Sequence, residues 1–195
     1  PPGGGCGSAY TEATIGQSID QWAAAATAAV ISACERFELP QPELVIEPGR
    51  TLVGPGGVAL YEIGTRKEIE GVRTYVSVDG GMADNIRPTL YDARYTAEIA
   101  NRANEGPIER ITLAGRYCES GDLLIEDIDL PRLSRGDLLA LPGAGAYSLA
   151  MASNYNLSLR PAVVMVRDGA ARVIRRRETY DDLFATDVAL AELMK

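Results

Sequence analysis

The chain has 195 residues, of which 46% are hydrophobic and 24% are charged, and this composition suits one or two compact globular domains. Its formal net charge is −8, and an acidic surface repels phosphate backbones, which excludes nucleic acid as an expected partner. Apolar runs stay well below the ~20 residues that span a bilayer, so we expect a cytoplasmic protein that does not bind a membrane.

The first clear element is an amphipathic helix over 18–37, because its apolar residues recur at three- and four-residue spacing on one face. Ser18 followed by Gln21 predicts a capping box, and Pro40 prevents the helix from continuing. A short apolar strand is expected over 43–46, and this order is typical of an α/β unit. One helix and one strand leave most of their apolar surface uncovered, so we expect a packing partner upstream or in another chain.

After Arg50 the sequence changes to short β-rich runs separated by Gly, Pro and Asp. This spacing predicts a mainly antiparallel β-sandwich or barrel. Asp168-Gly169 is the strongest hairpin signal, because both positions of such a turn adopt positive φ. A short helix is expected within 180–195. The expected strands cover residues 58–63, 72–78, 108–113, 138–141 and 161–166. The chain is therefore predicted to be an α+β fragment with two parts, 1–52 and 53–195.

Two segments of the first part could bind an anionic group. The run Gly3, Gly4 and Gly5 lets successive backbone N–H groups approach a phosphate, although such a run is more often an ordinary loop. Glu47 and Arg50 follow the predicted strand, at the edge where α/β folds bind their ligands. The alternative for this pair is a surface turn with a local ion pair.

Three later segments carry further candidates. Arg87 and Tyr91 could bind one carboxylate through a guanidinium and a phenol, or they could be a solvated arginine and a packed tyrosine. Cys118 lies beside Glu119 in a glycine-bounded turn, where a thiol can serve as an acid or a nucleophile. Tyr147 follows a run of glycine and alanine and could donate to a phosphate or a carboxylate, although alone it is more typical of a packed aromatic.

Some residue types are absent or rare. The sequence has no histidine, which excludes Ser-His-Asp and Cys-His arrangements and the usual zinc sites. The two other cysteines, Cys6 and Cys34, are expected to be small buried hydrophobes, and the spacing of all three indicates neither a disulfide framework nor a metal site. Because the chain begins without methionine, we expect it to be the carboxyl-terminal part of a longer polypeptide.

Taken in order, these segments resemble the carboxyl-terminal portion of the diaminopimelate decarboxylases, pyridoxal-phosphate enzymes of the fold-type III family that also contains ornithine and arginine decarboxylases. The most specific parts of the resemblance are 79–91, 118–122 and 143–147. In this family an amino-terminal (β/α)8 barrel holds the cofactor, and a carboxyl-terminal β domain completes the site, usually across a dimer interface. The resemblance implies that 1–52 forms the last βα units of the barrel and 53–195 the β domain with a short terminal helix.

The resemblance also implies roles at a pyridoxal 5′-phosphate site. Gly3 to Gly5 would hold the cofactor phosphate through backbone N–H groups, and Tyr147 would add a phenol donor. Glu47 would keep the pyridine nitrogen protonated, which makes the cofactor a stronger electron sink. Gly49 and Arg50 would bind the cofactor phosphate or a substrate carboxylate. Arg50 and Tyr147 would thus contact the substrate as well.

The substrate that the resemblance implies is meso-2,6-diaminopimelate, which is decarboxylated to L-lysine. Arg87 and Tyr91 would bind its distal carboxylate, and Glu119 would pair with its distal ammonium. Cys118 would donate a proton to the α-carbon, a role that requires a protonated thiol near neutral pH. Because a buried unmatched charge is costly, such a site should reject simple diamines.

Two residues of the family pattern are missing. The family binds its cofactor through a lysine on an early barrel strand and stacks a histidine on the ring, but the only lysines here, Lys67 and Lys195, lie outside any matching motif. We therefore expect the chain alone to be inactive. Its expected partners are the missing amino-terminal barrel portion and a second copy of the protein, with which it would form a homodimer with a shared active site. Two alternatives remain: a decarboxylase of ornithine, arginine or carboxynorspermidine, and a non-catalytic dimerisation or regulatory β domain.

Overall fold

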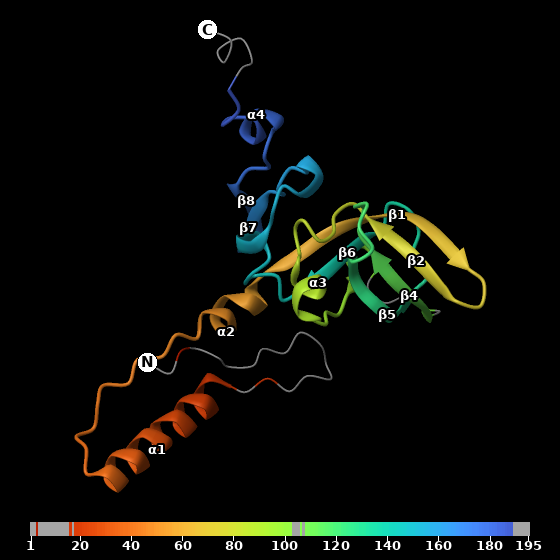
Figure 1. Cartoon of the computed structure of the whole chain (residues 1–195). Coiled ribbons are helices and arrows are strands. Elements are labelled where there is room, and N and C mark those ends of the chain that lie inside the picture. Colours follow the sequence, from red (N-terminus) through yellow and green to blue (C-terminus); the bar gives the residue numbers. More distant parts are fainter. Residues whose placement is uncertain (1–2, 4–15, 17, 103–105, 107, 189–195) are drawn as a thin grey trace.

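The computed structural model describes the chain except for residues 1–2, 4–15, 17, 103–105, 107 and 189–195. Helix α1 lies away from a curled sheet, and a small hairpin projects from that sheet toward the carboxyl end (Figure 1). Every helix of the described residues is too short or too polar to span a lipid bilayer. The helices are α1 (Ile19–Phe37), α2 (Gly49–Val53), α3 (Arg87–Tyr91) and α4 (Tyr180–Leu183), with 3₁₀ helices η1 (Gly54–Gly56), η2 (Leu149–Met151) and η3 (Tyr155–Leu157).

Six strands form one mixed sheet in the order β3-β6-β1-β2-β4-β5. All neighbours are antiparallel except β2 and β4, which are parallel. The edge strands β3 and β5 contact each other, so the sheet curls around its core. The expected mainly antiparallel β domain is confirmed, as one curled sheet with a parallel pair. Its strands are β1 (Val58–Ile69), β2 (Arg73–Val78), β3 (Glu98–Ile99), β4 (Ile108–Ala114), β5 (Leu123–Pro131) and β6 (Leu138–Pro142).

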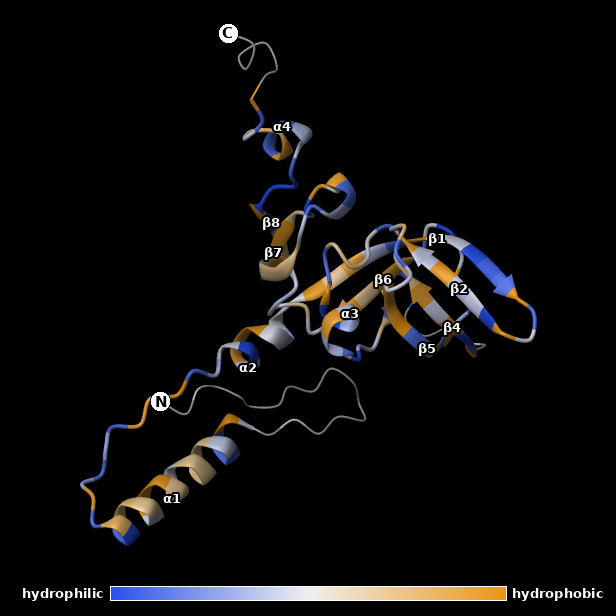
Figure 2. Cartoon of the chain, in the orientation of Figure 1, coloured by the Kyte–Doolittle hydropathy of each residue, from blue (hydrophilic) through white to orange (hydrophobic). Residues whose placement is uncertain are grey.

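The hydrophobic core lies inside this curl. Along β1, the buried side chains of Tyr61 and Ile63 alternate with the exposed Leu60 and Glu62, as a period of two requires. Many residues on the strands of the curl are hydrophobic, whereas much of the part of β1 near the turn to β2 is hydrophilic (Figure 2). The core residues are Tyr61, Ile63, Val76, Val78, Tyr95, Ala97, Ile99, Ile111, Leu113, Leu124, Ile125, Leu130, Leu133, Leu139 and Leu141.

Helix α1 confirms the expected boundaries and cap. The Ser18 hydroxyl accepts the N–H of Gln21 at 3.1 Å, and the Gln21 side chain accepts the Ser18 N–H at 3.2 Å. The helix ends at Phe37, and Glu38 follows with a φ of 53°. The face predicted to be apolar is partly covered, because Trp22 and Val30 are half-buried and Cys34 is buried, whereas Phe37 at the end of the helix is 61% exposed.

Three strand assignments differ from the sequence prediction: 43–46 form no strand within the described residues, and β3 and β5 were not expected. Residues 43–46 are extended but pair with no strand among the described residues, because a single apolar run needs a neighbouring strand to form a ladder. Conversely, the sequence analysis missed β5, an edge strand in which the exposed Glu126 and Asp127 are adjacent. Asp127 has a φ of 52°, and the pairing with β4 shifts register near this point, which hides the period of two.

The carboxyl-terminal part follows the expectation. Strands β7 (Val163–Arg167) and β8 (Ala170–Arg175) form a hairpin, and its turn residues Asp168 and Gly169 have φ values of 51° and 75°. Helix α4 supplies the predicted short helix within its described part. Apolar residues colour much of this hairpin in Figure 2, and Val166 on β7 is 72% exposed.

Candidate active site

Helix α3 places Arg87 between two tyrosines. The centre of the Arg87 guanidinium lies 5.5 Å from the ring centroid of Tyr91 and 5.5 Å from that of Tyr147. Both rings are about half exposed, at 59% and 47%. A cation over an aromatic face is attracted by the ring quadrupole, and a planar guanidinium carries its N–H donors in a fork whose geometry matches a carboxylate. The structure thus brings together candidates from two segments that lie 56 residues apart in the sequence.

Tyr147 reaches this position because the glycine-alanine run before it packs directly on the start of the β domain. The N–H of Ala144 donates to the Gly57 carbonyl at 2.9 Å, and the N–H of Gly145 donates to the Gly54 carbonyl at 3.0 Å. A Cβ on Gly145 would collide with the backbone of Val53. The absence of side chains therefore lets two backbone segments touch.

This close approach predicts a large effect of a small substitution. Gly145→Ala is expected to lower the free energy of unfolding by about 1–3 kcal/mol, because the added methyl group overpacks a backbone contact. Urea unfolding measures the change. The matched control is Gly56→Ala, where a Cβ meets no atom within 4 Å, and its effect should stay within about 0.5 kcal/mol. Equal effects of the two variants would contradict the close packing at Gly145.

The cofactor candidates of the first part lie next to α2. The Glu47 N–H donates to the Gly3 carbonyl at 3.0 Å, which joins the glycine run to the end of the extended segment 43–46. Gly49 and Arg50 begin α2, and the Arg50 side chain and that of Ala146 both flank Gly54. Arg50 is thereby close to the run that precedes Tyr147. The candidates Gly4 and Gly5, like Cys6, lie outside the described residues.

The Cys118 turn joins β4 to β5 and is exposed. Cys118 and Glu119 are both exposed, whereas Asp122 at the end of the turn is 3% exposed. The Asp122 carboxylate accepts the backbone N–H groups of Met82 at 2.6 Å and Tyr117 at 2.8 Å. Glu119 accepts weakly at 3.4 Å from its neighbour Gly121, and its carboxylate remains open to solvent. The thiol and the Glu119 carboxylate can therefore meet a ligand or another subunit.

Helix α3 and the Cys118 turn are bonded to each other. The Thr89 hydroxyl donates to the Gly121 carbonyl at 2.7 Å. The Arg116 N–H donates to the Gly80 carbonyl at 3.0 Å, in the loop that leads to α3. Two of the predicted motifs, 79–91 and 118–122, thus form one connected unit.

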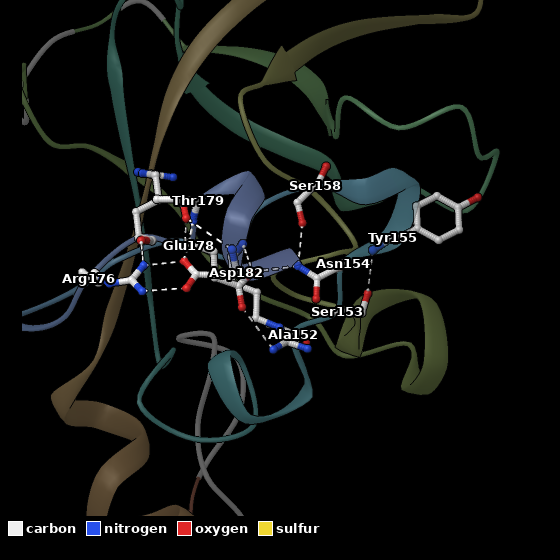
Figure 3. Close-up of polar contacts among 11 residues, drawn as sticks. Ala152, Ser153, Asn154, Tyr155, Ser158, Arg176, Glu178, Thr179 and Asp182 are labelled. Carbon is white, nitrogen blue, oxygen red and sulfur yellow. Dashed lines mark hydrogen bonds and ion pairs between the residues drawn. The ribbon is translucent and has the colours of Figure 1, made fainter. Parts of the chain in front are cut away.

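A polar network fastens the chain after β8 to the residues before β7. The Glu178 carboxylate accepts the Asn154 amide at 2.7 Å and the Arg160 N–H at 2.8 Å (Figure 3). Tyr155, beside Asn154, packs edge-on against Tyr117 with the ring centroids 5.7 Å apart. This contact supports the residue that precedes Cys118.

Two carboxylates with little exposure to solvent lie near Arg87: the half-buried Asp84, in the loop that leads to Arg87, and the buried Asp122. The Tyr61 hydroxyl donates to Asp84 at 2.5 Å, and the Gly81 N–H donates to the other Asp84 oxygen at 3.0 Å. Burial raises the pKa of the Asp84 carboxyl above its ordinary value. The pKa of the Tyr61 hydroxyl is also raised, mainly by burial and to a smaller extent by the negative charge of Asp84. Burial also raises the pKa of the Asp122 carboxyl, although the Tyr117 and Met82 N–H groups lower it by stabilising the charged form. The described residues contain no group of His, Cys, Asp or Glu that could hold a metal ion.

Sequence reasoning did not single out three buried oxygens near these candidates. Thr51 Oγ1, Asn85 Oδ1 and Ser148 Oγ have no hydrogen-bond partner within the described part of the chain. A buried unpartnered oxygen costs about 1–3 kcal/mol. Thr51, Asn85 and Ser148 lie within two residues of Arg50, Arg87 and Tyr147, respectively. This closeness to a predicted site residue is the one feature of the sequence that could have pointed to these three oxygens.

The predicted residues therefore form two groups. The first joins Arg87, Tyr91 and Tyr147, with the Cys118 turn attached through α3. The second joins Gly3 to Glu47, next to α2. The Cys118 and Glu47 side chains make no hydrogen bond to any described residue, so the groups are not connected through these two side chains.

Comparison with known proteins identifies the part of the chain that holds the sheet. Residues 50–145 match the family of the pyridoxal-dependent decarboxylase C-terminal sheet domain. Residues 50–145 belong to this family of sheet domains. The matched segment begins in α2 and contains the curled sheet, the Arg87 helix, the Cys118 turn and the glycine-alanine run up to Gly145.

Curated relatives extend the similarity over nearly the whole chain. The chain is 48% identical over 185 residues to a diaminopimelate decarboxylase of Synechocystis sp., and 49% identical over 186 residues to that of Bacillus subtilis. Each alignment covers 95% of this chain but only 39% and 42% of the respective relative. The chain thus spans about two fifths of the length of these relatives.

Solved structures show the same relationship. The crystal structure of diaminopimelate decarboxylase from M. jannaschii has a TM-score of 0.88 at 34% identity, over 98% of this chain and 43% of that one. The Helicobacter pylori enzyme in complex with L-lysine has a TM-score of 0.79 at 30% identity, over 99% of this chain and 44% of that one. A lysine/ornithine decarboxylase of Vibrio vulnificus in complex with cadaverine has a TM-score of 0.65 at 29% identity, over 80% of this chain and 40% of that one.

Proposed function

We propose that this chain is the carboxyl-terminal portion of a pyridoxal-phosphate enzyme that decarboxylates meso-2,6-diaminopimelate to L-lysine. The observation that carries this proposal is the placement of Arg87 between Tyr91 and Tyr147, which joins a carboxylate-binding motif to a phosphate-binding one. The names of the curated relatives support the same reaction. The higher TM-score of the diaminopimelate enzymes than of the lysine/ornithine enzyme favours diaminopimelate over ornithine.

We place the domain boundary at residue 53. Residues 1–52 would be the last βα units of a (β/α)8 barrel. The remainder of that barrel would supply strand partners to 43–46 and cover the apolar face of α1. Residues 53–195 would form the β domain. The 61% exposure of Phe37 and the unpaired extended segment support this division, because a barrel would bury such a side chain and pair such a segment.

The residues present fit pyridoxal 5′-phosphate by their chemistry. The glycine run, Arg50 and Tyr147 offer backbone N–H groups, a guanidinium and a phenol, which are the donors that a phosphate needs. Glu47, whose N–H donates to the Gly3 carbonyl, would offer its carboxylate to the pyridine nitrogen of the cofactor. When bound, the cofactor would withdraw electrons from the substrate α-carbon and so permit loss of carbon dioxide.

The chain's own side chains would bind the substrate and move a proton. Arg87 and Tyr91 would hold the distal carboxylate, and Glu119 would pair with the distal ammonium. The exposed Cys118 thiol would donate a proton to the α-carbon. Because the Cys118 and Glu119 side chains face solvent, they can complete the site of a second copy, and we propose a cytoplasmic homodimer with a shared site.

A substrate panel tests the proposal. The full-length protein that contains this chain is expected to release carbon dioxide from diaminopimelate, and far more slowly from ornithine, arginine and carboxynorspermidine. Preferred turnover of one of the three others would indicate the related decarboxylase. Absence of turnover with all four, in a protein that is folded and loaded with cofactor, would indicate a non-catalytic dimerisation or regulatory domain.

The 195-residue chain by itself is expected to lack activity. Mixed with pyridoxal phosphate, it should show neither the absorbance of a lysine-bound cofactor nor turnover, because the two lysines of the sequence, Lys67 and Lys195, lie outside the motif that carries the family's reactive lysine. Absorbance spectra and borohydride reduction followed by peptide mapping measure this. A reduced adduct on Lys67 together with decarboxylation would contradict the assignment of the reactive lysine to the barrel.

A further inference from the structure

The Asp122 carboxylate connects two segments that carry proposed functional residues. One oxygen accepts the N–H of Met82 at 2.6 Å, in the loop that leads to Arg87. The other accepts the N–H of Tyr117 at 2.8 Å, immediately before Cys118. Asp122 is 3% exposed, so these bonds are shielded from competing water. A single side chain therefore bonds the backbone of both segments.

The surroundings of Asp122 are shaped to receive this carboxylate. A Cβ on Gly81 or on Gly115 would collide with the Asp122 carboxyl group. The Gly115 N–H donates to the Asp122 carbonyl at 2.8 Å, and the Asp122 N–H donates to the Glu119 carbonyl at 3.1 Å. Burial and the Glu119 charge raise the pKa of Asp122, whereas the Tyr117 and Met82 N–H groups lower it. The two backbone donors therefore offset part of the cost of a buried carboxylate.

We propose that Asp122 is a positioning residue that holds the Cys118–Glu119 turn at a fixed spacing from the loop that carries Arg87 and Tyr91. This inference rests on the proposed function. The spacing is held whether the two segments serve one site or the two sites of a dimer. A proton donor that is misplaced by about 1 Å can lose about 10²-fold in rate, so the spacing matters for catalysis.

The Asp122→Asn variant of the full-length protein tests the inference. Asparagine keeps the shape but turns one acceptor oxygen into an amide N–H group, which faces a backbone N–H. We expect kcat with diaminopimelate to fall by about 10²-fold and KM to rise. In D2O, deuterium should enter both prochiral positions of the new methylene group instead of one, because the donor no longer delivers its proton from a fixed direction.

The matched control is Asp129→Asn on β5, whose side chain is 57% exposed and lies 3.8 Å from Arg110. It should leave kcat, KM and the deuterium pattern unchanged. If Asp122→Asn lowers kcat but keeps the wild-type KM and deuterium pattern, the variant only contains fewer folded molecules, and the positioning role is overturned. Wild-type values of all three quantities overturn it as well.

Amide hydrogen exchange gives a result that does not depend on activity. In the full-length protein without cofactor, Asp122→Asn is expected to speed exchange of at least one of the Met82 and Tyr117 amides roughly tenfold, because the asparagine side chain keeps one acceptor oxygen for these two N–H groups. Unchanged exchange at both amides overturns the inference. If the wild-type protein does not decarboxylate diaminopimelate, the proposed function fails, while the exchange result still decides whether Asp122 holds the two segments.

If Asp122→Asn does not fold, Thr89→Val provides the test. It removes the exposed hydroxyl that bonds the Gly121 carbonyl at 2.7 Å, a second tie between the same two segments. We expect a smaller fall in kcat, a rise in KM and mixed deuterium placement, all restored by Thr89→Ser. Wild-type behaviour of Thr89→Val would overturn the requirement for a fixed spacing.

Discussion

Replacing Cys118 with alanine in the full-length protein is expected to lower kcat with diaminopimelate by about 10²- to 10⁴-fold, the usual contribution of a positioned general acid. KM should change little, because the thiol donates a proton and does not bind the substrate ends. The exposed position of Cys118, at the tip of the turn between β4 and β5, lets it reach a substrate held by another part of the protein. Steady-state kinetics measure both parameters.

The control for this prediction is Ser120→Ala in the same turn. Ser120 is exposed, and its hydroxyl contacts only the Glu119 carboxylate, at 3.4 Å, among the described residues. Its kcat should equal that of the wild type. If Cys118→Ala also retains wild-type kcat, the proton comes from another group, and Cys118 is not the catalytic acid.

Replacing Arg87 with alanine is expected to remove about 2–5 kcal/mol of binding to a substrate that carries a distal carboxylate. This corresponds to a loss of about 30- to 4000-fold in kcat/KM, expressed mainly as a higher KM for diaminopimelate. For lysine-like analogues without the distal carboxylate, the change should be much smaller. The reason is that those analogues lack the distal carboxylate that the Arg87 guanidinium, between Tyr91 and Tyr147, would bind.

Two further variants sharpen this test. Arg94→Ala removes an exposed arginine shortly after α3 and should leave both substrates unaffected. Arg87→Lys keeps the charge but loses the planar pair of donors, so its KM should lie between those of the wild type and the alanine variant. Equal losses for diaminopimelate and the analogues would show that Arg87 supports the fold and does not select the distal carboxylate.

Features that depend on neighbouring residues were predictable from the sequence. The capping box at Ser18 follows from two side chains three positions apart. The Asp168-Gly169 turn follows from the backbone preferences of those two residues. The segments 79–91, 118–122 and 143–147 could be recognised as candidates, because chemically specific residues stand in glycine-bounded loops.

Features that depend on distant partners were not predictable in this way. Strand β5 was missed because a register shift at Asp127 disturbs the alternation that identifies a strand. Residues 43–46 were expected to form a strand, but a strand needs a neighbour, and the described residues supply none.

The sequence by itself determined which residue types are available for chemistry, and it set local features such as the cap of α1 and the Asp168-Gly169 turn. Only the tertiary structure decided that Arg87 lies between Tyr91 and Tyr147, and that Asp122 bonds both Met82 and Tyr117. The physical reason is that local preferences act over three or four residues, whereas the Arg87–Tyr147 and Met82–Asp122 contacts join residues that are 60 and 40 positions apart and form only when the curled sheet closes around its core.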